Sequence, residues 1–233
     1  MQAGGAPTPS PSAPTGSVPR VLPTPSSHPV RPSRPRVVLV GPPGAGKTTV
    51  ARTLARQLGV TARDTDADVE TVAGKPILEM FVDDGEPLFR TLEREAVAAA
   101  LTTHDGVLAL GGGAVLDAGT HAALATYVDR GGVVVFLDVT LAHAAPRVGF
   151  NQARPLLLGN PRAQWQQLMS ARRPVYRQVA TLVVDTDGRT PAQIAREIAG
   201  ALAACATGAT EAPGSPAAPG ATATPIHDDG ELQ

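Results

Sequence analysis

The sequence predicts an α/β domain of three layers, in which helices cover both faces of a mainly parallel five-stranded sheet. Short apolar segments typical of strands alternate with amphipathic helical segments from residue 36 to about residue 205. A glycine-rich loop joins the first strand to the first helix, and the run VVVFLD at 133–138 has the continuous apolar character of a strand buried on both faces. Strands alternating with helices in this way favour a parallel sheet with helical crossovers.

The first half of the domain opens with a strand, RVVLV, at residues 36–40. In the helix after the glycine-rich loop, apolar residues recur every four positions, and Gly59 suits a left-handed helix end. A short strand is expected to lead to Asp64. Two helical segments follow, one that ends near Gly74 and one from about residue 84 to about residue 101.

The second half adds three strands and two helices. The expected elements are, in order, a strand at 107–110, a helix from Asp117, strands at 133–138 and 181–185, and a helix from Pro191. Thr190 suits the capping position before that last helix, and proline suits its first turn.

The two ends of the chain differ in composition from the middle. Of the 23 prolines among 233 residues, ten fall in residues 1–35 and four in residues 206–233, among Ser, Thr, Ala and Gly. Such segments cannot bury enough apolar surface to offset the entropy of ordering. We therefore expect disordered tails at 1–35 and 206–233 and a folded domain at 36–205. The tails could be poorly chosen gene ends or linkers, and the sequence leaves this open.

The charge balance excludes some partners. Residues 36–205 contain 17 Lys and Arg against 17 Asp and Glu, so the domain has no basic excess of the kind that a nucleic-acid binder shows. No apolar run has the length of a membrane span or the character of a secretory leader. The single cysteine, Cys205, excludes an internal disulfide and fits a reducing compartment. We expect a cytoplasmic protein with neither nucleic-acid nor membrane partners.

The loop GPPGAGKT at 41–48 matches the Walker A pattern between a predicted strand and a predicted helix. Glycines let backbone N–H groups surround phosphates, the lysine reaches the β- and γ-phosphates, and the threonine hydroxyl ligates Mg²⁺. The nucleotide-binding residues are predicted to be Gly44, Ala45, Gly46, Lys47, Thr48 and Thr49. This motif alone leaves ATPase, GTPase and kinase open. Only two lysines exist, and neither lies in a guanine-specific motif.

Three further features are weak individually. Asp64 and Asp66 stand two apart at the end of the second strand, where open α/β sheets bind ligands, but a solvated turn or a helix cap would also explain them. Arg90 and Glu93 are one helical turn apart, as in many surface ion pairs. Three glycines at 111–113 allow close backbone approach, although a plain turn would use them too.

In order, these features resemble one family. Walker A, DTD at 64–66, GEPLFRTLE at 85–93, GGGAV at 111–115, RPLL at 154–157 and RRPVY at 172–176 resemble shikimate kinase from residue 36 to about residue 203. The resemblance implies a P-loop kinase fold with a mobile lid at about 149–162. It also implies Mg²⁺-dependent transfer of a phosphoryl group from ATP to the 3-hydroxyl of shikimate, in the biosynthesis of chorismate and the aromatic amino acids.

The resemblance also implies roles for individual residues. On the acceptor side, Asp66 is similar to the carboxylate that holds the acceptor hydroxyl, and Gly112 and Gly113 are similar to the backbone donors. Arg90 and Arg172 resemble the pair that clamps the shikimate carboxylate, a task that suits the planar fork of arginine. Glu93 would orient Arg90.

The remaining roles belong to the nucleotide side. Asp64 resembles an acid near Mg²⁺, which with Thr48 makes the predicted metal site. Arg154 resembles the lid arginine that closes on the transferring phosphate, and Lys47, Asp66 and Arg154 form the predicted catalytic set. Arg147 and Arg189 correspond to adenine-side contacts.

Some alternatives stay open. A kinase of the same fold that acts on another sugar acid, such as gluconate, would share Walker A but not Arg90 with Arg172. A regulator that binds nucleotide without catalysis is the rival from another class. Asp66 could act as a base or only position the hydroxyl. We expect a monomer whose partners are shikimate and ATP.

Overall fold

A parallel sheet of five strands forms the centre of the protein in a computed structural model, which describes residues 34–148 and 161–208. The strands are β1 (Val37–Val40), β2 (Ala62–Asp64), β3 (Val107–Ala109), β4 (Val134–Asp138) and β5 (Leu182–Asp185). They lie in the order β2-β3-β1-β4-β5, and all four pairings are parallel. The predicted fold class is therefore confirmed.

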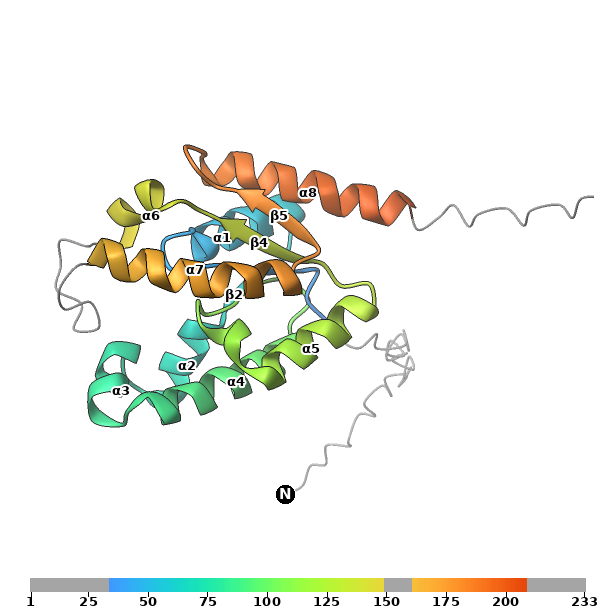
Figure 1. Cartoon of the computed structure of the whole chain (residues 1–233). Coiled ribbons are helices and arrows are strands. Elements are labelled where there is room, and N and C mark those ends of the chain that lie inside the picture. Colours follow the sequence, from blue (N-terminus) through green and yellow to red (C-terminus); the bar gives the residue numbers. More distant parts are fainter. Residues whose placement is uncertain (1–33, 149–160, 209–233) are drawn as a thin grey trace, which may run out of the picture. The chain divides into compact units, whose positions relative to one another are not determined.

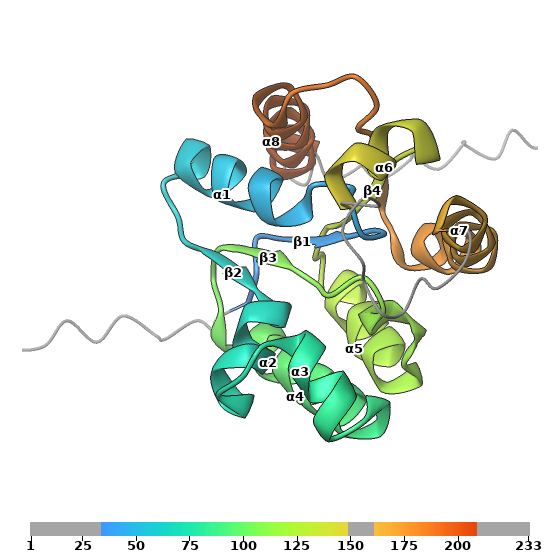
Figure 2. The ribbon, with the colours of Figure 1, turned by 90° about the vertical axis from the view of Figure 1, so that its left-hand side faces the viewer.

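Helices cover both faces of this sheet. They are α1 (Lys47–Leu58), α2 (Thr65–Ala73), α3 (Ile77–Asp83), α4 (Glu86–Thr103), α5 (Ala118–Asp129), α6 (Leu141–Val148), α7 (Pro161–Val179) and α8 (Pro191–Gly208), with a 3₁₀ turn, η1, at Ala114–Leu116. Figures 1 and 2 show α1 and α8 together on one face and α4 and α5 on the other. Helix α7 contacts β4, α5 and η1.

The core explains why these segments become strands. All four residues of β1 are fully buried, as are the apolar residues of β3 and the first four of β4, because helices shield both faces of the sheet. A second, smaller cluster lies among α2, α3 and α4, where Val69, Met80 and Phe89 are buried together. The segment that connects β2 to β3 therefore has an apolar core of its own.

Three helices were not predicted as separate elements. Helix α3 has only seven residues and follows Pro76, so its pattern is too short to stand out. Helices α6 and α7 each contain an internal proline, which normally argues against a helix interior. Helix α8 continues to Gly208, three residues beyond the predicted domain end.

Some predictions concern residues outside the described ranges. The predicted lid at 149–162 lies there except for residues 161 and 162, which begin α7. The predicted tails lie there almost entirely. No helix within 34–148 and 161–208 has both the length and the apolarity needed to cross a bilayer.

The sheet order brings three loops together. β1 pairs with β3, and β3 pairs with β2, so that Ala109 lies beside both Leu39 and Asp64. The carboxyl ends of these parallel strands lead into the glycine-rich loop, the acidic pair and the three glycines. This edge is where open α/β sheets bind ligands.

Candidate active site

The glycine-rich loop ends where α1 begins, at Lys47. Gly46 caps the helix with φ 88°, in the left-handed region that favours glycine, and no side chain caps the first turn. The first backbone N–H groups of α1 therefore remain available, and the helix dipole adds positive potential there. This is the arrangement with which helix N-termini bind phosphate.

Lys47 is held close to its own loop. Its Nζ donates hydrogen bonds to the carbonyl oxygens of Gly41, at 2.8 Å, and Pro42, at 3.1 Å. Burial lowers the pKa of the Lys47 ammonium, and the nearby carboxylates of Asp66 and Asp64 act in the opposite direction. A cation thus lies beside two acids at the end of the sheet.

A cavity of about 450 Å³ opens above the loop. It is lined by Pro43, Gly44, Gly46, Lys47, Thr48, Thr49, Asp64, Asp66, Leu110 and Arg147. Arg147, in the last turn of α6, donates to the carbonyl oxygen of Gly44 at 3.3 Å. The predicted phosphate-binding residues and the two acids at the end of β2, Asp64 and Asp66, therefore line the same cavity.

The hydroxyl of Thr48 donates to Asp64 Oδ2 at 2.6 Å. Within the described ranges, no group of three or more His, Cys, Asp or Glu side chains is arranged to hold a metal ion. Mg²⁺ does not need such a cage, because it is usually bound by one or two carboxylates together with substrate phosphates and water. The all-oxygen pair of Thr48 and Asp64 fits that requirement.

Asp66 lies in the first turn of α2, and its backbone N–H donates to Asp64 Oδ1 at 3.1 Å, so that Asp64 caps the helix. Burial raises the pKa of the Asp66 carboxyl to about 6; the charge of Asp64 adds to this rise, and Lys47 opposes it. The result is a partly buried carboxylate that is more basic than an ordinary aspartate.

The first of the three glycines packs against this carboxylate. A Cβ atom at Gly111 would lie 2.4 Å from Asp66 Oδ1 and 2.6 Å from Glu93 Oε1. The backbone N–H of Gly111 donates to the hydroxyl of buried Thr65 at 2.9 Å. A side chain at position 111 would therefore force both acids to shift.

Arg90 and Glu93 are more than a surface pair. Glu93 is only 3% exposed, and its Oε2 accepts from Arg90 Nη1 at 2.6 Å. Burial raises the pKa of the Glu93 carboxyl, and the Arg90 guanidinium opposes this rise. A Cβ atom at Gly113 would lie 2.5 Å from Arg90 Nη1. The pair thus lies against the glycines that also touch Asp66.

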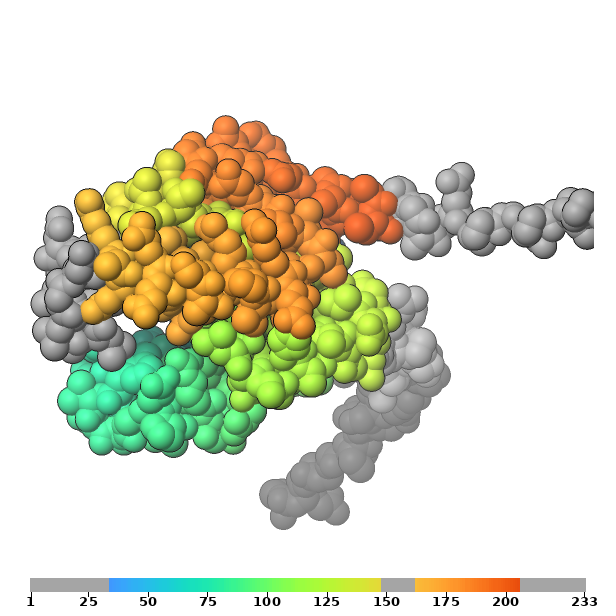
Figure 3. All heavy atoms as spheres, in the orientation of Figure 1, coloured from blue at the N-terminus to red at the C-terminus, as the bar shows by residue number. Residues whose placement is uncertain are grey.

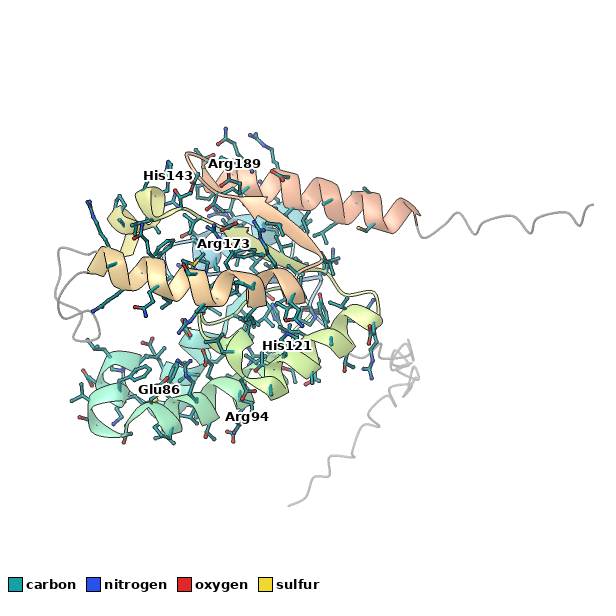
Figure 4. All side chains as sticks on the ribbon, viewed as in Figure 1. Glu86, Arg94, His121, His143, Arg173 and Arg189 are labelled. Atoms are coloured by element: carbon teal, nitrogen blue, oxygen red, sulfur yellow. The ribbon has the colours of Figure 1, made fainter. Side chains whose placement is uncertain are left out.

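Two adjacent arginines of α7 face different ways. Arg172 Nη1 donates to the carbonyl oxygen of Gly112 at 3.4 Å. Its charge, like that of Arg90, opposes the rise in the pKa of Glu93 that burial causes. Arg173 instead pairs with Asp138 at 2.9 Å, and Figure 4 shows it on the side of α7 toward β4. Arg172, and not Arg173, therefore contacts the acceptor-side glycines.

The remaining predicted residues are not brought into this cluster. Arg189 donates to the Asp185 carbonyl oxygen at 2.8 Å and pairs with Glu197 at 2.5 Å, near the start of α8 (Figure 4). Arg154 lies outside the described residues. Their predicted roles stay predictions.

Sequence reasoning missed the supporting contacts around the glycines. Gly111 was noted only as one of three glycines that allow close backbone approach, Thr65 only as the residue between two acids, and Tyr176 only as part of the motif at 172–176. The strict run of three glycines was the one signal that several side chains approach this backbone.

The fold and the site together define a P-loop phosphotransferase, with a loop of the Walker A pattern beside a partly buried carboxylate of raised pKa and two arginines. A family model for shikimate kinase matches residues 43–203. A shikimate kinase of Salinispora arenicola is 59% identical over 170 residues, which is 73% of this chain and 99% of the relative. One of Streptomyces coelicolor is 57% identical over 162 residues, which is 70% of this chain and 92% of the relative.

A solved structure is similar as well. Shikimate kinase from Acinetobacter baumannii, in complex with shikimate, is 34% identical, with a TM-score of 0.67 over 74% of this chain and 94% of that one. The chain belongs to the shikimate kinase family.

Proposed function

We infer that the protein transfers the γ-phosphoryl group of ATP to the 3-hydroxyl of shikimate, giving shikimate 3-phosphate and ADP on the route to chorismate and the aromatic amino acids. One observation carries this proposal: Asp66, which lines the cavity above the glycine-rich loop, and the Arg90–Glu93 pair meet at the same three glycines. Family membership supports shikimate as the acceptor.

On the nucleotide side, the residues of the loop bind and neutralise phosphate. Lys47 would exchange its two carbonyl partners for phosphate oxygens, because an ammonium held by neutral carbonyls gains more from an anion. Arg147 lines the same cavity, and Arg154 is proposed to add positive charge to the transferring group.

Magnesium is proposed to be held by Thr48 and, nearby, by Asp64. When bound, Mg²⁺ neutralises charge on the transferring phosphate. The hydrogen bond between Thr48 and Asp64 supports this assignment, because it keeps the two oxygen atoms that would ligate the metal close together at the end of β2.

On the acceptor side, Arg90 and Arg172 are proposed to bind the shikimate carboxylate. Both approach the glycines, Arg90 from α4 and Arg172 from α7, so that two guanidinium groups flank one small region. Glu93 fixes one nitrogen of Arg90 through a buried carboxylate, which limits the rotation of the guanidinium. Binding energy from the carboxylate then orients the hydroxyl.

Asp66 is proposed to take the proton of the 3-hydroxyl or to hold that hydroxyl in place. A pKa of about 6 leaves the Asp66 carboxylate largely ionised at neutral pH, yet makes it a better proton acceptor than an ordinary aspartate. Its position between Lys47 and Gly111 supports contact with both substrates.

The alternatives have less support. The high identity to shikimate kinases over nearly their whole length favours shikimate over gluconate. A regulator without catalysis would not need a partly buried basic carboxylate between a phosphate loop and an acceptor-side arginine pair.

The test is ADP release from ATP, measured by a coupled assay with shikimate, with gluconate and with no acceptor. We expect rapid release only with shikimate and only when Mg²⁺ is present. Equal rates with and without shikimate would contradict the proposal, and a higher rate with gluconate would favour the alternative kinase.

A further inference from the structure

The three glycines need anchors, because glycine loses more conformational freedom on ordering than any other residue. Thr65 provides one anchor, by accepting a hydrogen bond from the Gly111 N–H at 2.9 Å. The other is Tyr176 of α7, whose hydroxyl donates to the Gly112 carbonyl oxygen at 2.5 Å. The glycine run is therefore held at Gly111 by Thr65, the first residue of α2, and at Gly112 by Tyr176 of α7.

Tyr176 is itself rigidly placed. Its side chain is fully buried and stacks on Phe136 of β4, with ring centroids 5.1 Å apart and an interplanar angle of 20°. Burial raises the pKa of the Tyr176 hydroxyl to about 12, so that it stays a donor throughout the physiological range. In Figure 3, the side chains of α7 cover the face of the molecule that is turned toward the viewer, next to those of α5.

The carbonyl that Tyr176 holds belongs to the same planar peptide unit as the N–H of Gly113. In a trans peptide these two groups point in opposite directions, so fixing one fixes the other. Within the described residues, the N–H groups of Gly112 and Gly113 donate to no protein acceptor, although Arg90 lies against Gly113, and Asp66 and Glu93 lie against the neighbouring Gly111. Two donors are thus held ready beside the charged groups of the site.

The same carbonyl also accepts from Arg172, at 3.4 Å. Arg172 and Tyr176 are one turn apart on α7, so a single backbone oxygen ties both side chains to the glycines. We propose that Tyr176 is a positioning residue for acceptor binding, which orients the free N–H group of Gly113 and the Arg172 guanidinium without touching substrate. This proposal rests on the function inferred above.

Tyr127 provides a matched control, because it is a second buried tyrosine with the same kind of bond. It is 6% exposed, burial raises its pKa to about 12, and its hydroxyl donates to the Pro35 carbonyl oxygen at 3.0 Å. Pro35 precedes β1, so this bond lies at the amino end of the sheet, away from the site. Tyr→Phe at either position removes one hydroxyl and leaves the ring.

The experiment compares steady-state kinetics of the wild type, Tyr176→Phe and Tyr127→Phe, with shikimate and ATP varied separately. For Tyr176→Phe we expect the KM for shikimate to rise about tenfold, the scale of one lost hydrogen bond to a buried group. The KM for ATP should stay within about twofold, and kcat should fall less than the KM rises. Tyr127→Phe should match the wild type in all three constants, whatever it loses in melting temperature.

Direct titration of shikimate by calorimetry gives a readout that does not depend on turnover. The dissociation constant should rise by a similar factor in Tyr176→Phe alone. An unchanged KM and dissociation constant for shikimate, an equal rise in Tyr127→Phe, or a parallel rise in the KM for ATP would each overturn the proposal. If the wild type itself failed to phosphorylate shikimate, the inferred function would fail first, so the two failures are distinguishable.

Discussion

At the residue scale, Asp66 is held where burial and neighbouring charges act on it together. If it acts as the base, Asp66→Asn should lower kcat by roughly 10² or more and leave ATP affinity nearly unchanged, because the amide cannot accept the proton. If it only positions the hydroxyl, the same change should raise the KM for shikimate instead. Steady-state kinetics with both substrates measure this.

Asp66→Ala supplies the complementary result, because it removes the side chain that both roles require. It should impair kcat and KM together. A kcat/KM close to that of the wild type in this variant would show that Asp66 has no part in acceptor binding.

The same carboxylate should make stability depend on pH. Since burial raises its pKa to about 6, the folded protein binds this proton more tightly than the unfolded chain, and the free energy of unfolding falls as pH rises from about 4 to about 6. Asp66→Asn should therefore be more stable than the wild type at pH 7, by about 3 kcal/mol. The difference should disappear below about pH 4, where both states are protonated.

Thermal melting at several pH values, without nucleotide or Mg²⁺, measures this difference. Asp117 is the control, because the N–H of Thr120 holds the pKa of its carboxyl below the ordinary value. Asp117→Asn should lose stability at neutral pH, opposite in sign to Asp66→Asn. A destabilised Asp66→Asn at pH 7 would contradict the inferred burial of charge.

At the element scale, the loop after β3 depends on the absence of a side chain at Gly111. Gly111→Ala would place a Cβ atom against Asp66 and Glu93, and both acids would have to shift. We expect kcat/KM for shikimate to fall by about tenfold or more, since small misplacements of catalytic groups are costly.

Gly200→Ala in α8 is the matched control, because a Cβ atom there would meet nothing within 4 Å. That change should raise stability by about 0.5–1 kcal/mol, the usual gain from alanine in a helix interior, without altering kinetics. Normal kinetics in Gly111→Ala would show that the acids tolerate displacement.

At the scale of the whole molecule, every residue that the structure brings into the site lies between Gly41 and Tyr176, and α8 completes the core. A protein that spans residues 34–208 should therefore keep the kinetic constants of the full chain and, as predicted, be a monomer in light scattering. A loss of more than about tenfold in kcat/KM would show that residues outside this span contribute to the site.

Shortening the chain further gives the contrast. A protein that ends at residue 190 lacks α8, whose residues Ile194, Ala195 and Ile198 are buried against the core. It should fail to fold cooperatively, because a large apolar surface would remain exposed. Cooperative melting of this shorter protein would contradict the importance of α8.

The sequence alone determined the features that depend on local pattern. Strands β1, β3, β4 and β5 were predictable because they are short and apolar, and the phosphate loop because its glycines, lysine and threonine stand at set spacings. Helices α3, α6 and α7 were not predictable in this way. Helix α3 is too short to show a helical period, and α6 and α7 contain internal prolines, which are typical of helix ends.

Tertiary structure alone decided which groups meet. Gly111 and Thr65 are 46 residues apart, and Gly112 and Tyr176 are 64 apart, so no local pattern relates them. They meet because β3 pairs with both β1 and β2, and because α7 packs beside the turn after β3. Successive helical residues point about 100° apart, so only the packing of α7 directs Arg172 to the glycines and Arg173 to Asp138.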